Sequence, residues 1–166
     1  KDNGDVPTDN SFGNAVYSYG HRNPQGLAWD SKERLWATEH GRSGVASGYD
    51  EVNLIDKGVN YGWPVVQGDE EKSGMRRPVI HSGSNTTWAP AGLVIVKDEL
   101  FFTGLLGEAL YTAKIAGQAL GPLQTHFKKQ FGRLRAISVA LDNSFYISTS
   151  NTDGRGDIKP GDDKII

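Results

Sequence analysis

One pattern of apolar segments occurs three times along the 166-residue chain. Each copy has two short alternating segments joined by a tight turn that contains Asp or Lys, and a third apolar segment follows after a variable loop. Such a pattern predicts a β-hairpin followed by a third strand. The hairpins begin near Gly26, Gly92 and Ile137, and the third strands are expected at 50–55, 109–115 and 162–166. The sequence therefore predicts an all-β protein.

Repeats of roughly 40–50 residues with several strands each are typical of β-propellers, whose units bury their faces by packing between neighbours. The copies lie near 15–64, 89–115 and 133–166 of one domain that spans 1–166, and the polar, turn-rich residues 1–14 are expected to form a loop. Propellers close with about four to eight units, so three copies predict about half of a ring. Either the chain is part of a larger ring, or two copies complete one.

Composition argues against several partners. Lys and Arg total 18 against 20 for Asp and Glu, and the net charge of −2 provides no basic field for nucleic acid. The apolar runs are far shorter than the roughly 20 residues that a membrane-spanning helix needs. The chain has no cysteine, which rules out disulfides and thiolate metal sites. Its first residues, Lys-Asp-Asn-Gly-Asp, do not resemble a secretion signal.

The most distinctive polar segment is the turn before the first hairpin, which carries Arg22 and Asn23 between Gly20 and Pro24. Glycine and proline fix the backbone of such a turn, so it can hold polar side chains at the end of a sheet. A guanidinium offers paired donors that fit a carboxylate or an ortho-dione, and an amide both donates and accepts. An Arg-Asn pair in a turn also commonly caps the backbone or faces solvent. The residues alone leave both interpretations open.

A second cationic pair stands at the start of the third repeat, where Arg133 and Arg135 are two residues apart. In an extended strand, residues i and i+2 point to the same side of the sheet. Two cations on one side repel each other unless an anion lies between them. The pair therefore predicts either a solvated strand edge or an anion site.

Several strings together resemble the soluble pyrroloquinoline quinone (PQQ)-dependent aldose sugar dehydrogenases of the glucose/sorbosone dehydrogenase family. They are Gly-His-Arg-Asn-Pro-Gln-Gly at 20–26, Thr-Glu-His-Gly at 38–41, Asp-Glu-Val-Asn-Leu-Ile at 50–55 and Asn-Tyr-Gly-Trp-Pro at 60–64. The resemblance implies a six-bladed β-propeller, of which this chain is the C-terminal half. It also implies oxidation of an aldose to a lactone with PQQ, calcium and an external electron acceptor, in the periplasm or outside the cell.

The resemblance further implies a role for particular residues. Arg22, Asn23, Arg133 and Arg135 would hold PQQ. Many relatives also place a lysine after the second strand of the middle repeat, where this chain reads Gly-Leu-Leu-Gly at 104–107 and offers no cation.

Calcium is the second ligand that the resemblance implies. Main-chain carbonyls of Gly41 and Arg42 would bind the calcium that polarises the quinone, although some relatives have proline where this chain has Arg42. Glu51 and Tyr61 would bind a separate structural calcium. Without the resemblance, the sequence is equally consistent with a second interpretation, in which Glu51 is an ordinary surface carboxylate and Tyr61 is an ordinary turn tyrosine.

The catalytic base of the family is a histidine in the other half of the propeller, and none of His21, His40, His81 and His126 matches its motif. The isolated chain is therefore expected to be inactive or very slow. The alternative is a non-catalytic propeller that serves as a binding module. A half-ring would also expose two apolar faces, through which two copies could pair as a homodimer.

Overall fold

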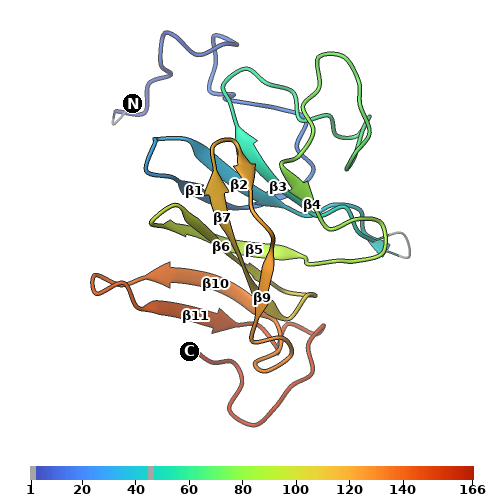
Figure 1. The fold of residues 1–166 in the computed structure, drawn as a ribbon, viewed down its shortest axis with the longest axis vertical. Coiled ribbons are helices and arrows are strands. Elements are labelled where there is room, and N and C mark those ends of the chain that lie inside the picture. Colours follow the sequence, from blue (N-terminus) through green and yellow to red (C-terminus); the bar gives the residue numbers. More distant parts are fainter. Residues whose placement is uncertain (1–2, 45–46) are drawn as a thin grey trace.

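The computed structural model describes residues 3–44 and 47–166, and the regular elements of this part of the chain are all β-strands (Figure 1). Residues 3–14 form a succession of turns, as expected for the loop at 1–14, of which residues 1 and 2 lie outside the described part. The described residues contain no helix that could cross a membrane. The strands are β1 (Pro24–Trp29), β2 (Leu35–Glu39), β3 (Glu51–Ile55), β4 (Ile80–His81), β5 (Pro90–Val96), β6 (Glu99–Gly104), β7 (Ala109–Ala116), β8 (Ala119–Leu120), β9 (Gln124–His126), β10 (Leu134–Val139) and β11 (Phe145–Thr149).

These strands form three antiparallel units, which Figure 1 shows stacked in chain order. The first unit has the order β1-β2-β3-β4, and in the second β5-β6-β7 is extended by β8 and β9, which both pair with β7. The third unit contains β10 and β11, and the end of the chain adds to it because the Thr149 N–H donates to the Lys164 carbonyl at 2.9 Å. All three predicted hairpins are confirmed. A third strand is expected at 162–166, but the structure, which describes these residues, has no regular strand there, and only residues 164–166 pair with β11.

Apolar side chains hold neighbouring units together. The core between the first and second units contains Trp36, Val52, Leu54, Trp88, Leu93, Leu100, Phe102, Ala109 and Tyr111. The core between the second and third units contains Leu110, Leu134, Ile137 and Ile147. Because each fully buried side chain of this size contributes about 1.5–3 kcal/mol, these interfaces are the main source of stability. Each unit thus depends on its neighbour.

Two glycines allow the first strands of adjacent units to approach closely. A Cβ atom on Gly26 in β1 would lie 2.5 Å from the Ala91 carbonyl oxygen and 2.6 Å from the Leu93 Cβ in β5. A Cβ atom on Gly92 in β5 would lie 2.7 Å from the Ile137 nitrogen in β10. Only glycine fits at such distances. The same device therefore spaces the first unit from the second and the second from the third.

Buried threonines form a repeated hydrogen bond across these interfaces. The Thr38 hydroxyl in β2 donates to the Ala91 carbonyl of the second unit at 3.2 Å. The Thr103 hydroxyl in β6 donates to the Arg135 carbonyl of the third unit at 2.5 Å. Each bond satisfies a main-chain carbonyl on the first strand of the next unit.

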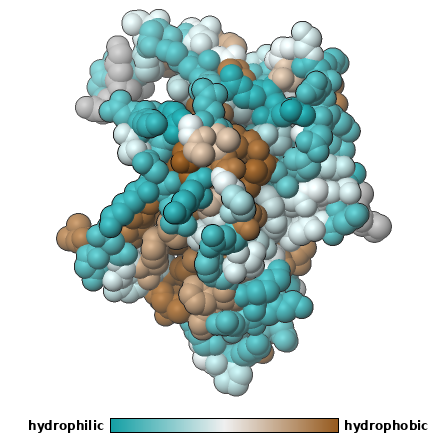
Figure 2. All heavy atoms as spheres, viewed as in Figure 1, coloured by the Kyte–Doolittle hydropathy of each residue, from teal (hydrophilic) through white to brown (hydrophobic). Residues whose placement is uncertain are grey.

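Apolar surface remains on the outer side of the first strand. Leu27 is 63% and Trp29 is 60% exposed in β1, whereas Leu93, which follows the equivalent glycine in β5, is buried. Figure 2 shows that apolar residues gather across the middle of one face of the molecule, while hydrophilic residues cover its upper and lower parts. The first strand of the first unit therefore exposes large apolar side chains, whereas the first strand of the second unit buries such a side chain against its neighbour.

Candidate functional site

Loops from all three units meet around a cavity of about 400 Å³. This volume lies within the range of about 300–1,000 Å³ that is usual for small-molecule sites. The loop after β2, the segment before β5, the loop after β6 and the residue before β10 all contribute to the wall. The lining residues are His40, Arg42, Ser43, Gly44, Ser47, Asp50, Thr87, Ala89, Leu105, Leu106, Arg133 and Arg155.

Arg133 is the buried cation of this cavity, with 5% of its surface exposed. Its Nη2 lies 2.9 Å from Asp153 Oδ2, and its Nη1 donates to the Leu105 carbonyl at 3.3 Å. Arg135 reaches the same Asp153 oxygen at 3.2 Å, although it is half exposed and does not line the cavity. The hydrogen bond from Arg133 is the main reason that the pKa of Asp153 is lowered. The two arginines thus lie together, and Asp153 is an anion between them.

Arg22 reaches the wall of the same cavity through the loop after β2. Its Nη2 donates to Ser43 Oγ at 2.6 Å, and its guanidinium lies over the Trp63 ring at 5.5 Å. Asn23 is oriented differently, because its Oδ1 accepts a hydrogen bond from Gln25 Nε2 at 2.8 Å and its side chain does not line the cavity. Arg133 therefore lines the larger cavity, whereas Arg22 lines a smaller neighbouring cavity and is linked to the larger one through Ser43, and Asn23 lines neither.

Glu39, at the end of β2, fixes the turn that carries Arg22. Its buried carboxylate accepts hydrogen bonds from the main-chain N–H of Arg22 at 2.9 Å and of Asn23 at 3.3 Å. It also accepts from Asn53 Nδ2 at 2.8 Å and lies 3.2 Å from His21 Nδ1. Sequence reasoning missed Glu39, although its place in Thr-Glu-His-Gly at the end of a strand was available as a signal.

Asp50 connects the first two units at the cavity. Its side chain is buried and accepts hydrogen bonds from Gly41 N at 2.9 Å, Trp88 N at 2.6 Å and Ala89 N at 2.8 Å. Trp88 and Ala89 lie 38 and 39 residues after Asp50 in the sequence, so no local motif could have revealed these two hydrogen bonds. Asp50 thereby sets the position of the loop that begins at Gly41.

Arg42 is a lining residue with one buried polar atom left unsatisfied. Its main-chain N–H donates to the Gly48 carbonyl at 2.9 Å, so the Gly41 carbonyl of the same trans peptide points away from Gly48. Its guanidinium lies over the Tyr49 ring at 4.6 Å, yet its Nε is buried without a hydrogen-bond partner among the described residues. Native proteins rarely leave such a donor unpaired, and because this nitrogen is buried, an anionic ligand in the cavity would reach it only after the Arg42 side chain moved.

A smaller cavity of about 10 Å³ brings together all four predicted metal residues. Its volume is close to that of a single water. Gly41, Arg42, Glu51 and Tyr61 line it together with Glu39. The Tyr61 hydroxyl donates to the Leu54 carbonyl at 2.6 Å, so a calcium contact of Tyr61 would have to use its main-chain carbonyl.

The small cavity offers oxygen ligands for a hard cation, but two cationic residues, Arg22 and Arg42, line it as well. Burial raises the pKa of Glu51 to about 7, and the nearby Glu39 carboxylate adds to the shift. Asn53 Nδ2 donates to both carboxylates, while its Oδ1 is buried without a partner among the described residues. Calcium takes carboxylate, amide and main-chain oxygens. The described residues nevertheless contain no group of three or more His, Cys, Asp or Glu side chains that could hold a metal, so main-chain oxygens or waters would have to complete the shell.

Each of the four histidines contacts another group in the structure. His40 lines the larger cavity with its Nε2 2.8 Å from the Pro90 carbonyl, and burial lowers its pKa. His21 stacks on Tyr61, His81 lies 3.1 Å from Asp69, and His126 lies 3.1 Å from the Thr112 hydroxyl. These contacts give the histidines structural roles.

A lysine from another part of the chain contacts the segment 104–107, which carries no cation of its own. Lys128, which is distant in sequence, donates from Nζ to the Gly107 carbonyl at 2.5 Å. The segment 104–107 contains no lysine, and only the fold brings Lys128 to it.

The chain is similar in sequence to proteins of one known family. The model of the family described as Glucose / Sorbosone dehydrogenase matches residues 1–158. The chain is 47% identical over 75 residues to Quinoprotein glucose dehydrogenase B of Acinetobacter calcoaceticus, in an alignment that covers 43% of this chain and 15% of that protein. It is 40% identical over 84 residues to Aldose sugar dehydrogenase YliI of Escherichia coli, covering 46% of this chain and 22% of that protein.

Solved structures extend the likeness to nearly the whole chain. The PQQ-bound form of aldose sugar dehydrogenase from Streptomyces coelicolor superposes with a TM-score of 0.87 at 42% identity, over 96% of this chain and 47% of that one. The apo-form of the soluble aldose sugar dehydrogenase from Escherichia coli superposes with a TM-score of 0.73 at 26% identity, over 88% of this chain and 47% of that one. The chain thus spans less than half the length of each of these four relatives.

Proposed function

The chain belongs to the glucose/sorbosone dehydrogenase family, and from this premise we propose that it is the cofactor-binding half of a PQQ- and calcium-dependent aldose dehydrogenase. The complete protein would oxidise an aldose at its anomeric carbon to a lactone and pass the electrons to an external acceptor, in the periplasm or outside the cell. The three units would be blades of a β-propeller and would make up about half of a six-bladed ring.

The observation that carries the proposal is the set of cations around the 400 Å³ cavity. Arg133 is buried there, Arg42 has a buried Nε without a partner among the described residues, and Arg22 is bonded to the wall through Ser43. PQQ is flat and carries three carboxylates and two adjacent quinone oxygens, which are acceptors for such donors. When bound, PQQ would supply the oxidising chemistry by accepting two electrons from the sugar.

The residues of this chain would bind and orient that group. Arg133, held by Asp153, would present its guanidinium to a carboxylate of PQQ, and Arg135 would contribute a second charge from the rim. Arg22, which is bonded to Ser43 in the cavity wall, would add a further charge, with Asn23 beside it. The apolar Leu105 and Leu106 would exclude water from one side of the cavity.

Calcium would use oxygen ligands of the same region. The main-chain carbonyls of Gly41 and Arg42 would be ligands of the calcium that polarises the quinone. Glu51 and the main-chain carbonyl of Tyr61 would hold the structural calcium in the small cavity, where a cation would also relieve the repulsion between Glu51 and Glu39. The base that removes the hydroxyl proton would come from another part of the complete protein.

Titration of the complete protein with PQQ, in calcium-containing buffer, tests the proposal. Binding should shift the quinone absorbance, and Arg133→Met should weaken it at least tenfold, because it removes a charge-assisted pair worth about 1.5–3 kcal/mol. Lys114→Gln, which removes an exposed cation of β7 that does not line the cavity, is the matched control and should bind as the wild type does. No absorbance shift in the correctly folded protein would exclude the dehydrogenase proposal.

A non-catalytic binding module is the second candidate. Asp153 already provides an anion for Arg133 and Arg135, so these two cations can be stable without a cofactor. Under this alternative, Arg133→Met would lower the free energy of unfolding and PQQ would not protect the wild-type protein against heat. The PQQ titration and the test of heat protection by PQQ therefore separate the two functions.

A further inference from the structure

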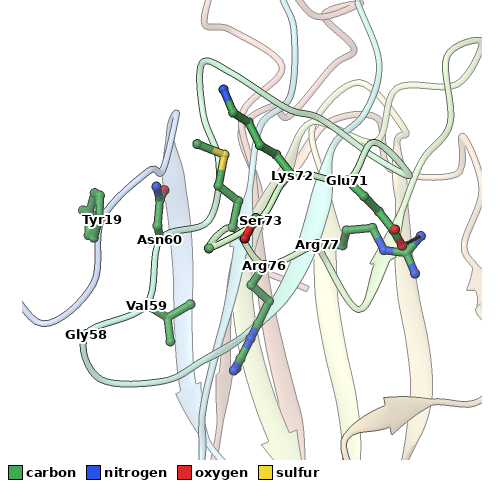
Figure 3. A pocket seen from close by; sticks show the side chains of 11 residues that line it. Tyr19, Gly58, Val59, Asn60, Glu71, Lys72, Ser73, Arg76 and Arg77 are labelled. Carbon is green, nitrogen blue, oxygen red and sulfur yellow. Dashed lines mark ion pairs between the residues drawn. The ribbon is translucent and has the colours of Figure 1, made fainter.

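A second large cavity, of about 750 Å³, opens on the first unit and shares no lining residue with the two cavities described above (Figure 3). It is formed by Tyr19, by residues 58–60 and by the loop at 71–77. Neither the hairpin pattern nor the family resemblance assigned a role to this loop.

Main-chain hydrogen bonds shape the floor of this cavity. Tyr19 N donates to the Val59 carbonyl at 3.1 Å, and Arg76 N donates to the Asn60 carbonyl at 2.8 Å. Asn60 also forms parallel bridges with Tyr19 on one side and with Met75 on the other. Because three segments are paired side by side, the cavity is preformed and does not depend on side-chain positions alone.

The lining is cationic, with Lys72, Arg76 and Arg77 against the single carboxylate of Glu71. Arg77 lies 3.3 Å from Glu71, and Arg76 is paired with Asp56. The Lys72 amino group forms no ion pair within residues 3–44 and 47–166. Asp69 also lies 4.0 Å from Arg77, so carboxylates offset the charge of both arginines. The cavity therefore suits a ligand with separated single charges better than a dense polyphosphate.

The arrangement of the side chains indicates an elongated ligand. In Figure 3, the side chains of Lys72 and Arg76 extend in opposite directions on one side of the cavity, and Tyr19 and Asn60 stand on the other. A ligand that meets both cations must therefore carry carboxylates at separated positions.

The opposite side offers groups that suit a hydroxylated ring. The Tyr19 ring is 47% exposed and is supported by an edge contact with Phe12 at a centroid distance of 5.5 Å. Asn60 Oδ1 accepts from Gly62 N at 2.9 Å, which leaves the amide nitrogen to donate to a ligand. An aromatic face with amide and hydroxyl donors beside it packs against rings that are apolar on one face and polar at their edge.

We propose that this cavity binds an acidic oligosaccharide, with carboxylates of separate sugar residues at Lys72 and Arg76 and a sugar ring against Tyr19. The preference for a ligand with several carboxylates follows from the lining itself. The choice of a sugar rather than another polycarboxylate rests on the proposed function, since a sugar-oxidising protein encounters such chains.

Calorimetric titration of the complete protein, without added PQQ, tests this site. Trigalacturonic acid should bind, its methyl ester should not, and binding should weaken as salt is raised. Lys72→Gln and Arg76→Gln should each weaken binding about twofold to fivefold, as expected for exposed ion pairs. Lys114→Gln, at an exposed position of β7, removes a cation elsewhere and should leave binding unchanged. Tyr19→Ala should weaken binding of the acid without changing its salt dependence.

Several results would overturn the proposal. Equal binding of the acid and its methyl ester would show that the cavity does not recognise the carboxylate charge. Binding of inorganic phosphate as tight as that of the acid would show that the cavity is a simple anion site. Wild-type affinity in the double variant Lys72→Gln, Arg76→Gln would place the ligand elsewhere. Because PQQ is absent from this titration, a failure of the PQQ-binding experiment leaves its result unchanged, and the two proposals can fail separately.

Discussion

Replacing Asp50 by asparagine is the most direct test of how the units are joined at the candidate site. The Asp50 side chain is 1% exposed, and its two oxygens accept three main-chain hydrogen bonds, one from Gly41 and two from the segment before β5. Asparagine has nearly the same shape. If its oxygen keeps the bonds to Trp88 and Ala89, its NH₂ group must face the Gly41 N–H, which is also a donor.

The expected cost follows from this geometry. The variant loses one hydrogen bond to a charged acceptor, worth about 1.5–3 kcal/mol, and weakens two others by about 0.5–1 kcal/mol each. Removal of the buried charge returns part of this cost, because a carboxylate is expensive to desolvate. We expect Asp50→Asn to lower the free energy of unfolding by about 2–4 kcal/mol, a large part of the usual 5–15 kcal/mol.

Urea denaturation of the complete protein, followed by tryptophan fluorescence, measures this difference. Asp69→Asn is the matched control, because Asp69 is 85% exposed and its ion pairs should contribute less than about 1 kcal/mol. A loss below about 1 kcal/mol for Asp50→Asn would refute the reasoning. It would mean that the three N–H groups do not depend on the carboxylate.

Three further predictions follow from the fold. Thr103→Val should cost about 1–2 kcal/mol in urea denaturation, because it leaves the Arg135 carbonyl unpaired, whereas Thr125→Val at an exposed position should be nearly neutral. Burial raises the pKa of Asp30, but bonds from Trp36 and Arg34 outweigh this effect and lower it overall. Its stabilising contribution is therefore complete above about pH 4 and is lost as the pH falls further, so Asp30→Asn should flatten the acid side of the stability profile. Leu27→Asp should prevent another unit, from the same protein or a second copy, from covering β1, and light scattering or proteolysis should then detect a smaller or less protected particle.

The hairpins could be predicted from sequence because their signals are local. Alternating apolar residues and tight turns define β1 with β2, β5 with β6, and β10 with β11 within short stretches. The strands β4, β8 and β9 were not predicted, since they are two or three residues long and exist only through pairing with a longer strand. Strands of that length carry no periodicity of their own.

The candidate site likewise contains residues that could be predicted from local sequence and residues that could not. Arg22 and Arg133 stand in short motifs, and the resemblance to a family identified them from the sequence. The residues that hold them could not be identified, because Ser43 is 21 residues from Arg22 and Asp153 is 20 residues from Arg133. Their importance lies in side-chain contacts that depend on how the loops fold over the sheet ends.

These contacts also connect ligand binding to the packing of the units. Asp50 ties the first unit to the second at the cavity wall, and Arg133 ties the third unit to the Leu105 carbonyl of the second. A ligand that spans this cavity would touch all three units only when they are correctly stacked. It would therefore stabilise the stack itself, by about 2.7 kcal/mol at a ligand concentration one hundred times its Kd. The apolar interfaces alone would hold the units together, and the ligand would fix the spacing between their loops.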